Sequence, residues 1–380
     1  PGVLPTVPQL AAAKARGTLL TSEMEAFCAL CPCRIIAITG SDGKTTTSTV
    51  TAELLKHAGY TVHLGGNIGT PLFIRLPEIQ PTDMVVLELS SFQLHSMTCA
   101  PDTAVITNIS PNHLDVHPDY RDYIDAKKQV FRNQRPEGRL VLNRDNDVTA
   151  ACAPEAKGSV RWFSRRERVP DGAFLREDGM LCLARGGRVT EVLLSSELRI
   201  PGAHNIENML AAFAAVDGWS DIAAMRSVAR SFTGVSHRLE TVRVLRGVTY
   251  INDSIASSPN RTIAGLGCFA EKVILIAGGK DKGIPYDALG PVICRHVKRL
   301  YLTGMTAGVI RRAVEAAPEY RTGAPEIYEL DGFADAIRAA AASAEAGDTV
   351  LLSPASTSFD RFRNFEERGN AFRAVVEGLE

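Results

Sequence analysis

Short apolar runs that do not alternate with polar residues are the feature that most constrains the fold of this chain. The run MVVLEL at residues 84–89 is almost wholly apolar, and similar runs occur at 34–39 and 103–109. A strand with this composition is buried on both faces, as in a parallel sheet covered by helices. Segments with helical patterns lie between the runs, at 44–57 and 120–133. We therefore predict an α/β fold with a mostly parallel sheet.

The pattern changes along the chain and divides it into segments. Residues 1–21 are rich in Pro and Ala and are interpreted as a linker, and residues 22–234 form one predicted domain. Short β-like segments with glycine turns, at about 159–199, predict an antiparallel insert in that domain. Residues 235–380 repeat the alternation of apolar runs and helices, which predicts a second, Rossmann-like α/β domain.

Composition and charge exclude some classes of function. The formal net charge of -1 gives no electrostatic reason to expect nucleic acid or an anionic membrane as a partner. The chain begins at Pro1 without a signal sequence, and no apolar run is long enough to span a bilayer, so we expect a cytoplasmic protein that has been processed or trimmed. Cys28, Cys31 and Cys33 could attract a soft metal, but no second cluster completes a four-ligand site, and ordinary reduced thiols are favoured.

The sequence IIAITGSDGKTTTSTV at residues 35–50 is typical of a phosphate-binding loop between a strand and a helix. The usual template places a glycine five positions before the glycine of G-K-T, but that position is Ile38 here, and the nearest glycine is Gly40. Backbone N–H groups at a helix start favour an anion, Lys44 can reach terminal phosphates, and Thr45 offers a hydroxyl to Mg²⁺. We predict a shortened nucleotide loop rather than a chance turn with a solvated lysine.

Two further polar residues follow apolar runs at the edge where parallel strands place their ligands. Glu88 ends the run at 84–89, and a carboxylate there is costly to bury unless it binds a metal or a polar partner. His113 and Asp115 lie in the loop that follows the run at 103–109. A histidine in such a loop is more often a surface residue than a ligand. Convergence of His113 and Glu88 with the phosphate loop on a divalent cation is the alternative.

Two predicted helices carry lysine and asparagine residues that have both a structural and a functional interpretation. Lys127 and Lys128 lie on an amphipathic helix, where the pattern by itself favours a solvated face. Asn205 and Asn208 lie at the start of the helix predicted over 204–216. Asn205 suits a helix cap, whereas both amides could instead bind a base edge or a sugar. Spacing alone leaves these alternatives open.

Polar residues also follow strands of the second predicted domain. Asp253 ends one apolar run, as a ribose or metal contact would, and a glycine-rich turn offers Lys280 and Lys282 to an anion. The hydroxyl-rich sequence SPASTSF, which ends near Ser358, precedes a helix and suits a carboxylate. Each feature alone is a turn or cap more often than a site. Together they predict anion-binding loops.

Taken in order over nearly the whole chain, these motifs resemble the ATP-dependent Mur ligases, and within that family the members that add D-glutamate. The motifs are TGSDGKTTT, GGNIGTPL, LELSSFQL, ITNISPNHLD, GAHNIENMLAA, HRLE, YINDSIASSP and LLSPASTSFDRFRNFEERG. The diaminopimelate- or lysine-adding ligases and the folylpolyglutamate synthases are similar in the loop but less so at the C-terminus. The resemblance implies a P-loop ATPase-like central domain, followed by an amino-acid-binding domain. It also implies ADP-forming ligation of D-glutamate to UDP-N-acetylmuramoyl-L-alanine through an acyl phosphate, in peptidoglycan precursor synthesis.

The resemblance also implies roles for individual residues. Those that would contact ATP are Gly40, Ser41, Asp42, Gly43, Lys44, Thr45, Thr46, Asn205, Asn208, Arg238 and Asp253. Those that would hold Mg²⁺ are Thr45, Glu88, His113 and Lys127. Lys127 aligns with the lysine that is carbamylated in the family. The residues that would be catalytic are Lys44, Glu88, His113 and Lys127. Those facing the muramoyl-alanine substrate would be Asn67, Ser90, Gln93 and His113. Those binding D-glutamate would be Ser257, Lys282, Ser358, Phe359 and Phe365.

Two departures from the family pattern bear on these expectations. The family has an additional N-terminal domain for the uridine diphosphate, and this chain resembles the segment after it, so a truncated and inactive ATP-binding module is an alternative. Many members carry lysine where this chain has Ile255, so one charge contact to substrate is lost or supplied by another residue. We expect the chain to act as a monomer.

Overall fold

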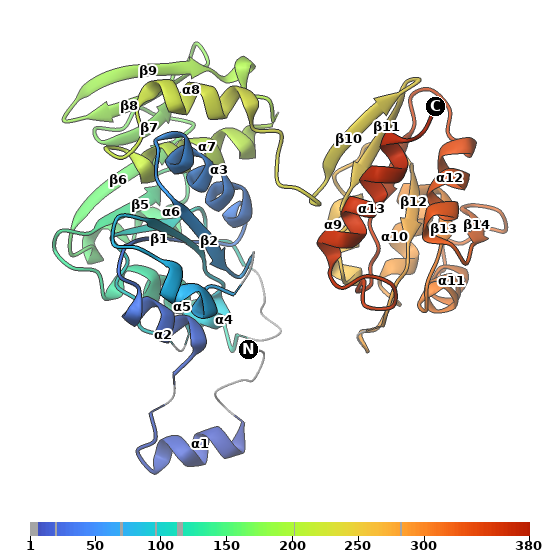
Figure 1. Ribbon diagram of the computed structural model, residues 1–380, viewed down its shortest axis with the longest axis horizontal. Helices are drawn as coiled ribbons and strands as arrows, with labels where there is room; N and C mark the ends of the chain where they lie inside the picture. Colours follow the sequence, from blue (N-terminus) through green and yellow to red (C-terminus); the bar gives the residue numbers. More distant parts are fainter. Residues whose placement is uncertain are drawn as a thin grey trace. The chain divides into compact units, whose positions relative to one another are not determined.

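The computed structural model describes residues 7–19, 21–68, 71–95, 97–111, 117–200, 202–281 and 283–380. The chain divides into two compact units, residues 1–233 and 234–380, each with its own sheet (Figure 1). Each unit is described by itself.

The first unit is built on one nine-stranded sheet in the order β2-β3-β1-β4-β5-β6-β7-β8-β9. Neighbouring strands from β2 to β7 run parallel, and β8 and β9 pair antiparallel at the far edge. The insert predicted over about 159–199 is therefore antiparallel only from β8 onward, because β6 and β7 continue the parallel pairing. All four strands extend the main sheet and do not form a separate layer. The strands are β1 (Arg34–Thr39), β2 (Val62–Gly66), β3 (Met84–Glu88), β4 (Thr103–Ile106), β5 (Arg139–Asn143), β6 (Ser159–Ser164), β7 (Gly172–Leu175), β8 (Met180–Arg185) and β9 (Arg188–Leu194).

Helices cover both faces of the central strands. On one face, Ile35 and Ala37 of β1 belong to a buried cluster with Phe27 and Val130, which lie on α2 (Glu23–Leu30) and α5 (Tyr120–Arg132). A further set of helices packs together and contacts the sheet: α3 (Lys44–His57), α7 (Ala203–Val216) and α8 (Ile222–Ser231) (Figure 1). The central strands are thus buried on both faces, and the predicted parallel α/β fold is confirmed.

Four short helices in this unit did not follow from the sequence pattern: α1 (Pro8–Ala15), α2, α4 (Ser91–Leu94) and α6 (Asp147–Ala150). Helix α1 falls within the segment interpreted as a linker, and none of its residues is buried. It therefore adds nothing to the core.

The second unit has a six-stranded sheet in the order β10-β11-β15-β12-β13-β14. Only β10 is antiparallel to its neighbour, so this sheet is also mostly parallel. The strands are β10 (Glu240–Leu245), β11 (Val248–Asn252), β12 (Val273–Ala277), β13 (Val297–Leu302), β14 (Glu326–Glu329) and β15 (Thr349–Leu352). The helices are α9 (Pro259–Leu266), α10 (Leu289–His296), α11 (Ala307–Glu315), α12 (Phe333–Ser343) and α13 (Phe365–Glu377).

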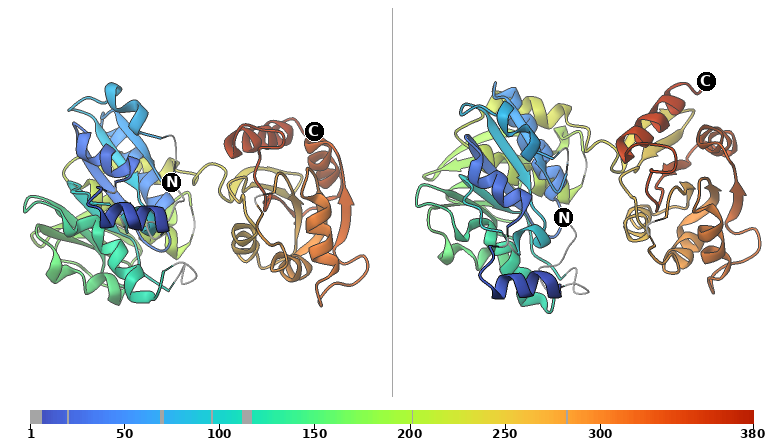
Figure 2. Two further views of the ribbon diagram at one scale, coloured as in Figure 1. Left: turned by 90° about the horizontal axis from the view of Figure 1, so that it is seen from below. Right: turned by 60° about the horizontal axis from the view of Figure 1, so that its bottom comes forward.

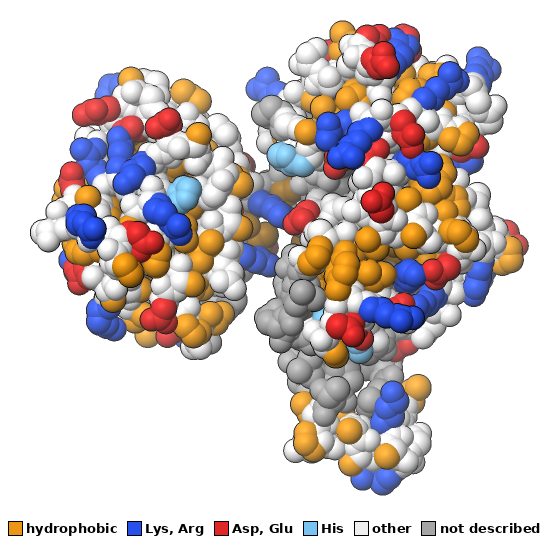
Figure 3. Space-filling model, turned by 180° about the vertical axis from the view of Figure 1, so that it is seen from behind, with side chains coloured by type: hydrophobic (Ala, Val, Ile, Leu, Met, Phe, Trp, Pro, Cys, Tyr) orange, Lys and Arg blue, Asp and Glu red, His pale blue; other side chains and the backbone are white. Residues whose placement is uncertain are grey.

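The side chains of successive residues in β12 pack into different hydrophobic clusters, one on each face of the sheet. Leu275 packs in a cluster with Leu266 and Ile310, whereas Ile274 packs in a second cluster with Ile337 and Phe372. Helices α9, α10 and α11 therefore cover one face of the sheet and α12 and α13 the other (Figures 1 and 2). No helix in the described part of the chain is long and apolar enough to cross a membrane. Acidic and basic side chains are interspersed over the face drawn in Figure 3.

Candidate functional site

The segment that joins β1 to α3 forms a tight loop with two glycines. Gly43 is the N-cap of α3 and has a left-handed backbone, with φ 78°. A Cβ on Gly43 would lie 2.2 Å from Asn208 Oδ1, and one on Gly40 would lie 1.9 Å from Thr107 Oγ1. Neither position has room for a side chain, so the shortened loop depends on both glycines.

Residues that follow β4 hold the loop from the side. Thr107 Oγ1 donates a hydrogen bond to the Asp42 carbonyl at 2.6 Å, and the Asp42 N–H donates to Asn108 Oδ1 at 2.9 Å. Tyr123 on α5 reaches the loop through a hydroxyl–hydroxyl contact of 3.0 Å with Ser41. The loop is therefore fixed in front of the α3 N-terminus, where first-turn N–H groups and the helix dipole favour an anion.

Two lysines meet at one carbonyl of this loop. Lys44 Nζ donates to the Gly40 carbonyl at 3.0 Å and to the Ser41 carbonyl at 2.8 Å. Lys127 Nζ, from α5, donates to the same Gly40 carbonyl at 2.8 Å. The solvated helix face that the pattern favoured for Lys127 is therefore wrong, because this side chain is only 1% exposed. Lys128, in contrast, pairs with Glu155 at the surface.

Burial changes the acid–base chemistry of Lys127. Desolvation, with a smaller contribution from the nearby charge of Lys44, lowers the pKa of the Lys127 amine from 10.5 to about 7. The Tyr123 ring lies 4.5 Å from the same nitrogen. A large part of this amine is therefore uncharged near neutral pH, which makes it a nucleophile.

Glu88 lies at the end of β3, beside the strand that leads into the loop. It pairs with Ile38 in the parallel register, two residues before Gly40. The side chain is 1% exposed; Oε1 accepts a hydrogen bond from Asn67 Nδ2 at 2.9 Å, and Oε2 is buried without a partner among the described residues. A buried carboxylate oxygen without a partner is costly, and a hard cation would satisfy it. Thr45 in the first turn of α3 is also buried.

The remaining predicted metal ligand is not described. His113 and Asp115 lie outside the described residues, as does Lys282 of the second unit. The described part of the predicted cation site thus consists of Thr45, Glu88 and Lys127.

Residues predicted to face the muramoyl substrate either contact Glu88 or lie a few positions after it in the sequence. Asn67 donates from its backbone N–H to the Glu88 carbonyl at 2.8 Å, in addition to its side-chain bond. Ser90 and Gln93 form a capping box at the start of α4, in which Gln93 N–H donates to Ser90 Oγ at 3.2 Å and Ser90 N–H donates to Gln93 Oε1 at 3.0 Å. These two side chains therefore stabilise the helix that carries them.

The asparagines of α7 differ in their surroundings. Helix α7 begins at Ala203 with Gly202 as its N-cap, so the cap role considered for Asn205 is wrong. Asn208 is 6% exposed and accepts a hydrogen bond from Thr47 Oγ1 at 3.3 Å. Asn208 lies close to Gly43, so α7 contacts the phosphate loop at this point.

In the second unit, Asp253 follows β11 and is 4% exposed. Its Oδ2 accepts from Ser353 Oγ at 2.8 Å and its Oδ1 from the Leu239 N–H at 3.3 Å. Burial nevertheless raises the pKa of this carboxyl from 3.8 to about 6. Arg238, which precedes Leu239 in the sequence, is exposed.

The hydroxyl-rich loop after β15 uses its hydroxyls internally. Ser356 Oγ lies 2.9 Å from the Tyr286 hydroxyl and 2.8 Å from Thr306 Oγ1, and Thr357 Oγ1 donates to the Lys280 carbonyl at 2.9 Å. Ser358 is also buried, Ser257 is half-buried, and Phe359 is 62% exposed. The loop is therefore tied to the glycine-rich turn that holds Lys280.

Several residues of these sites were not predicted from the sequence, among them Thr107, Asn108, Tyr123 and Arg368. Tyr123 supports the phosphate loop, and its position four residues before Lys127 on α5 was an available signal. Arg368 on α13 is buried and donates to the Ser254 carbonyl at 2.8 Å and the Ser356 carbonyl at 3.0 Å. Ser254 Oγ in turn donates to the Phe365 carbonyl at 2.8 Å. Burial lowers the pKa of Arg368 to about 10.

Comparison with known proteins gives the family. Residues 38–216 match the model of the Mur ligase middle domain, and residues 237–356 match that of the Mur ligase glutamate ligase domain. The chain belongs to the Mur ligase family. It is 54% identical to the UDP-N-acetylmuramoylalanine–D-glutamate ligase of Acetivibrio thermocellus, over the whole of this chain and 82% of that relative. The ligase of the same name from Ruminiclostridium cellulolyticum is 48% identical over the same shares.

Solved structures show that this Mur ligase shares the family fold. MurF from Acinetobacter baumannii has a TM-score of 0.63 at 16% identity, covering 91% of this chain and 77% of that one. The UDP-N-acetylmuramate–alanine ligase MurC from Thermotoga maritima has a TM-score of 0.60 at 17% identity, covering 100% of this chain and 84% of that one. The predicted family and fold are confirmed.

Proposed function

We propose that this Mur ligase joins D-glutamate to UDP-N-acetylmuramoyl-L-alanine and converts ATP to ADP and phosphate, in the cytoplasmic synthesis of peptidoglycan precursors. Relatives that are 46–54% identical carry the name of this activity. The structural observation that carries the proposal is the convergence of Lys44 and Lys127 on the Gly40 carbonyl, at a loop built for phosphate and beside the buried Glu88.

The reaction is expected to proceed in two steps. The alanyl carboxylate attacks the γ-phosphorus of ATP, the bond to the bridging oxygen of ADP breaks, and an acyl phosphate forms. The D-glutamate amine then attacks the acyl carbon, loses a proton, and inorganic phosphate leaves. Lys44 and the α3 N-terminus stabilise negative charge on the transferring group. No side-chain nucleophile is needed.

The donor set fits a magnesium ion. Glu88 offers a buried oxygen without a described partner, and Thr45 offers a hydroxyl at the phosphate loop. Both are the hard oxygen ligands that Mg²⁺ prefers. When bound, Mg²⁺ neutralises charge on the β- and γ-phosphates. His113 is the further ligand implied by the family resemblance.

The low pKa of Lys127 supports its carbamylation. The ammonium group first loses one proton. The uncharged amine then attacks CO₂, a nitrogen–carbon bond forms as one carbon–oxygen π bond opens, a second proton is released, and an anionic carbamate results. The exchange of a buried cation for an anion beside Lys44 removes the repulsion between the two lysines. The carbamate would then provide a further oxygen ligand at the cation site.

In the second unit, we propose that D-glutamate is bound by Ser257, Lys282, Ser358, Phe359 and Phe365. Ile255 leaves this region without the lysine that many relatives carry. Arg261 NH1 donates to the Ile255 carbonyl at 3.1 Å, and its guanidinium is exposed. Arg261 is therefore the cation placed to take over that contact. Arg238 and Asp253 remain proposed contacts to ATP, as does Asn205.

The proposal is tested with UDP-N-acetylmuramoyl-L-alanine labelled with ¹⁸O in its carboxylate. Purified chain with ATP, Mg²⁺ and D-glutamate should release phosphate that contains one ¹⁸O, and release should require both substrates. Release that requires a different amino acid would assign another Mur-type or folylpolyglutamate ligation. ATP binding without substrate-dependent release would indicate a module without catalysis.

A further inference from the structure

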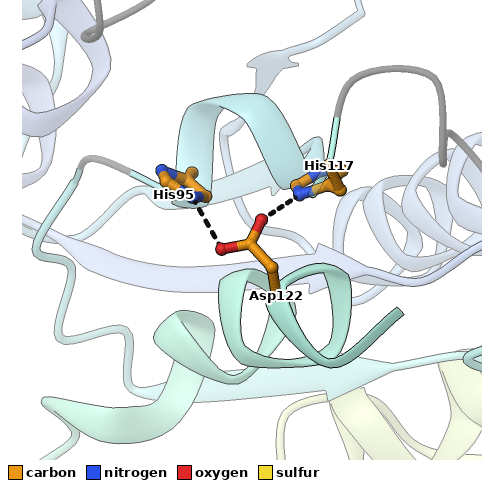
Figure 4. Close-up of side chains that lie close together, drawn as sticks. All are labelled: His95, His117 and Asp122. Atoms are coloured by element: carbon orange, nitrogen blue, oxygen red, sulfur yellow. Dashed lines mark hydrogen bonds and ion pairs between the residues drawn. The ribbon is translucent and has the colours of Figure 1, made fainter. Parts of the chain in front are cut away.

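Two histidines and an aspartate meet between α4 and α5 of the first unit (Figure 4). His117 Nδ1 lies 2.6 Å from Asp122 Oδ2, and His95 Nε2 lies 3.1 Å from Asp122 Oδ1. One ligand atom from each of the three lies within 4.8 Å of the other two. His95 follows the last residue of α4, and Asp122 is in the first turn of α5, so the cluster joins two helices.

The surroundings of His117 fix its ring. The side chain is 3% exposed, and Nε2 lies 3.0 Å from Ser91 Oγ. The Phe92 ring stacks on it at 5.6 Å, and the Tyr123 ring meets it edge-on at 5.1 Å. A metal-binding histidine commonly donates its second ring N–H to a fixed acceptor, which sets the tautomer. Ser91 Oγ is in place to accept that proton.

The other two side chains leave the cluster open on one side. The side chains of His95 and Asp122 are 46% and 30% exposed. Two imidazoles and a carboxylate with an open position are a donor set typical of zinc and similar first-row ions, whose remaining positions water completes. Bonds of about 2.0–2.1 Å in a tetrahedral site place ligand atoms about 3.4 Å apart. The hydrogen-bonded pairs here are 2.6 and 3.1 Å apart, so a bound ion would replace both hydrogen bonds and move the ligand atoms slightly apart.

From this juxtaposition we propose that His95, His117 and Asp122 form a binding site for a zinc-like divalent cation. On binding, the neutral His117 imidazole keeps one proton, which moves from Nδ1 to Nε2 and is donated to Ser91 Oγ. His95 likewise binds through Nε2, and the proton that this nitrogen donates to Asp122 Oδ1 moves to Nδ1. No net proton is released from the neutral rings.

The site is distinct from the proposed magnesium site, because it shares no residue with it. It nevertheless connects to the same machinery through the two helices. Helix α4 carries the Ser90–Gln93 capping box directly after Glu88, and α5 carries Tyr123 and Lys127. A bound ion would therefore cross-link the segment after β3 to the helix that supports the phosphate loop.

The experiment uses the full chain with Zn²⁺ alone, without nucleotide or substrate. Binding is measured by competition with a chelating dye, and thermal unfolding is recorded in parallel. We expect one zinc ion per chain that is lost in His95→Ala and Asp122→Asn and retained in His57→Ala, an exposed histidine on α3. Zinc should raise the melting temperature of the wild type and of His57→Ala only. Ser91→Ala should weaken binding by about tenfold or more.

The eight free cysteines offer competing ligands, and Co²⁺ distinguishes them. Cobalt at the proposed site should give visible absorption bands without the thiolate charge-transfer band, and these bands should be absent in His95→Ala. His95 and Asp122 are partly exposed, so their variants are expected to fold. Unchanged zinc affinity in both variants, or a thiolate band that survives in His95→Ala, would overturn the proposal and leave a hydrogen-bonded triad.

Discussion

Lys44 and Lys127 donate to the same backbone carbonyl, that of Gly40, from distances of 3.0 and 2.8 Å. The two lysines come from helices that are far apart in sequence, and one of them is almost fully buried. Two ammonium groups at one carbonyl repel each other, which contributes to the low pKa of Lys127. The pair is therefore suited to a site that receives negative charge, either as phosphate or as a carbamate.

Lys44 is expected to act on the transferring phosphoryl group. Replacement by alanine in Lys44→Ala should lower kcat by about 10²- to 10³-fold or more, because a charge aimed at the transition state is removed. Unfolding by urea should change little. Lys56→Ala, at an exposed position of the same helix, is the matched control and should retain full activity. A fully active Lys44→Ala enzyme would refute the role of the loop.

Lys127 should make stability depend on pH in a defined direction. Its pKa is about 7 in the folded chain and 10.5 when unperturbed, so the unfolded state binds more protons between these values. Stability must therefore rise with pH across this window, by up to about 1.4 kcal/mol per pH unit from this one group. In Lys127→Met, the free energy of unfolding should lose that slope.

The measurement is urea unfolding between pH 7.5 and 9 in buffer freed of bicarbonate, so that the amine stays unmodified. Lys128→Met, which removes the neighbouring surface lysine, should keep the wild-type slope. Equal slopes in the wild type and Lys127→Met would contradict the buried amine. Addition of bicarbonate should raise the activity of the wild type and leave Lys127→Met unaffected.

The loop glycines provide a test that separates strain from steric conflict. Gly43 and Gly59 both have left-handed backbones, with φ of 78° and 92°. A Cβ on Gly43 meets Asn208, whereas one on Gly59 meets nothing within 4 Å. Gly59→Ala should destabilise by about 1 kcal/mol from strain alone. Gly43→Ala should destabilise the chain more than Gly59→Ala does and should also weaken ATP binding, measured by calorimetry. If the two variants change ATP affinity equally, the described loop geometry is wrong.

Arg261 is expected to contribute to D-glutamate binding in place of the lysine that Ile255 replaces. Arg261→Ala should raise KM for D-glutamate by about tenfold, as for a lost charged hydrogen bond, and leave KM for ATP unchanged. Arg295→Ala on α10 removes an exposed arginine elsewhere in the same unit and serves as the control. If KM for D-glutamate does not change, another residue supplies the contact or it is absent.

Local patterns were sufficient for the elements that surround the phosphate loop. The predicted bounds of 34–39 for β1 and 44–57 for α3 agree with the structure. A strand buried on both faces gives a continuous apolar run, and the glycines of the turn separate that run from the helix. The capping box of Ser90 and Gln93 was also readable as S-x-x-Q, although it was interpreted only through the family resemblance.

Long-range contacts were not readable in the same way. The amphipathic pattern of α5 could not show that Lys127 reaches Gly40, because that contact depends on how α5 packs against β1 and β4. The meeting of His95, His117 and Asp122 likewise results from the packing of α4 on α5. Strand β10 was missed, because it lies at a sheet edge with no fully buried residue and so lacks the apolar run that marked the central strands.

We propose that the shortened loop binds the phosphates of ATP beside the cation ligands. A crystal structure of the chain with a non-hydrolysable ATP analogue and Mg²⁺ tests it most directly. We expect the triphosphate at the α3 N-terminus, with Lys44 on its terminal phosphates and the ion bound by Thr45 and Glu88. A triphosphate bound elsewhere, with Lys44 directed into solvent and no ion at Glu88, would contradict it.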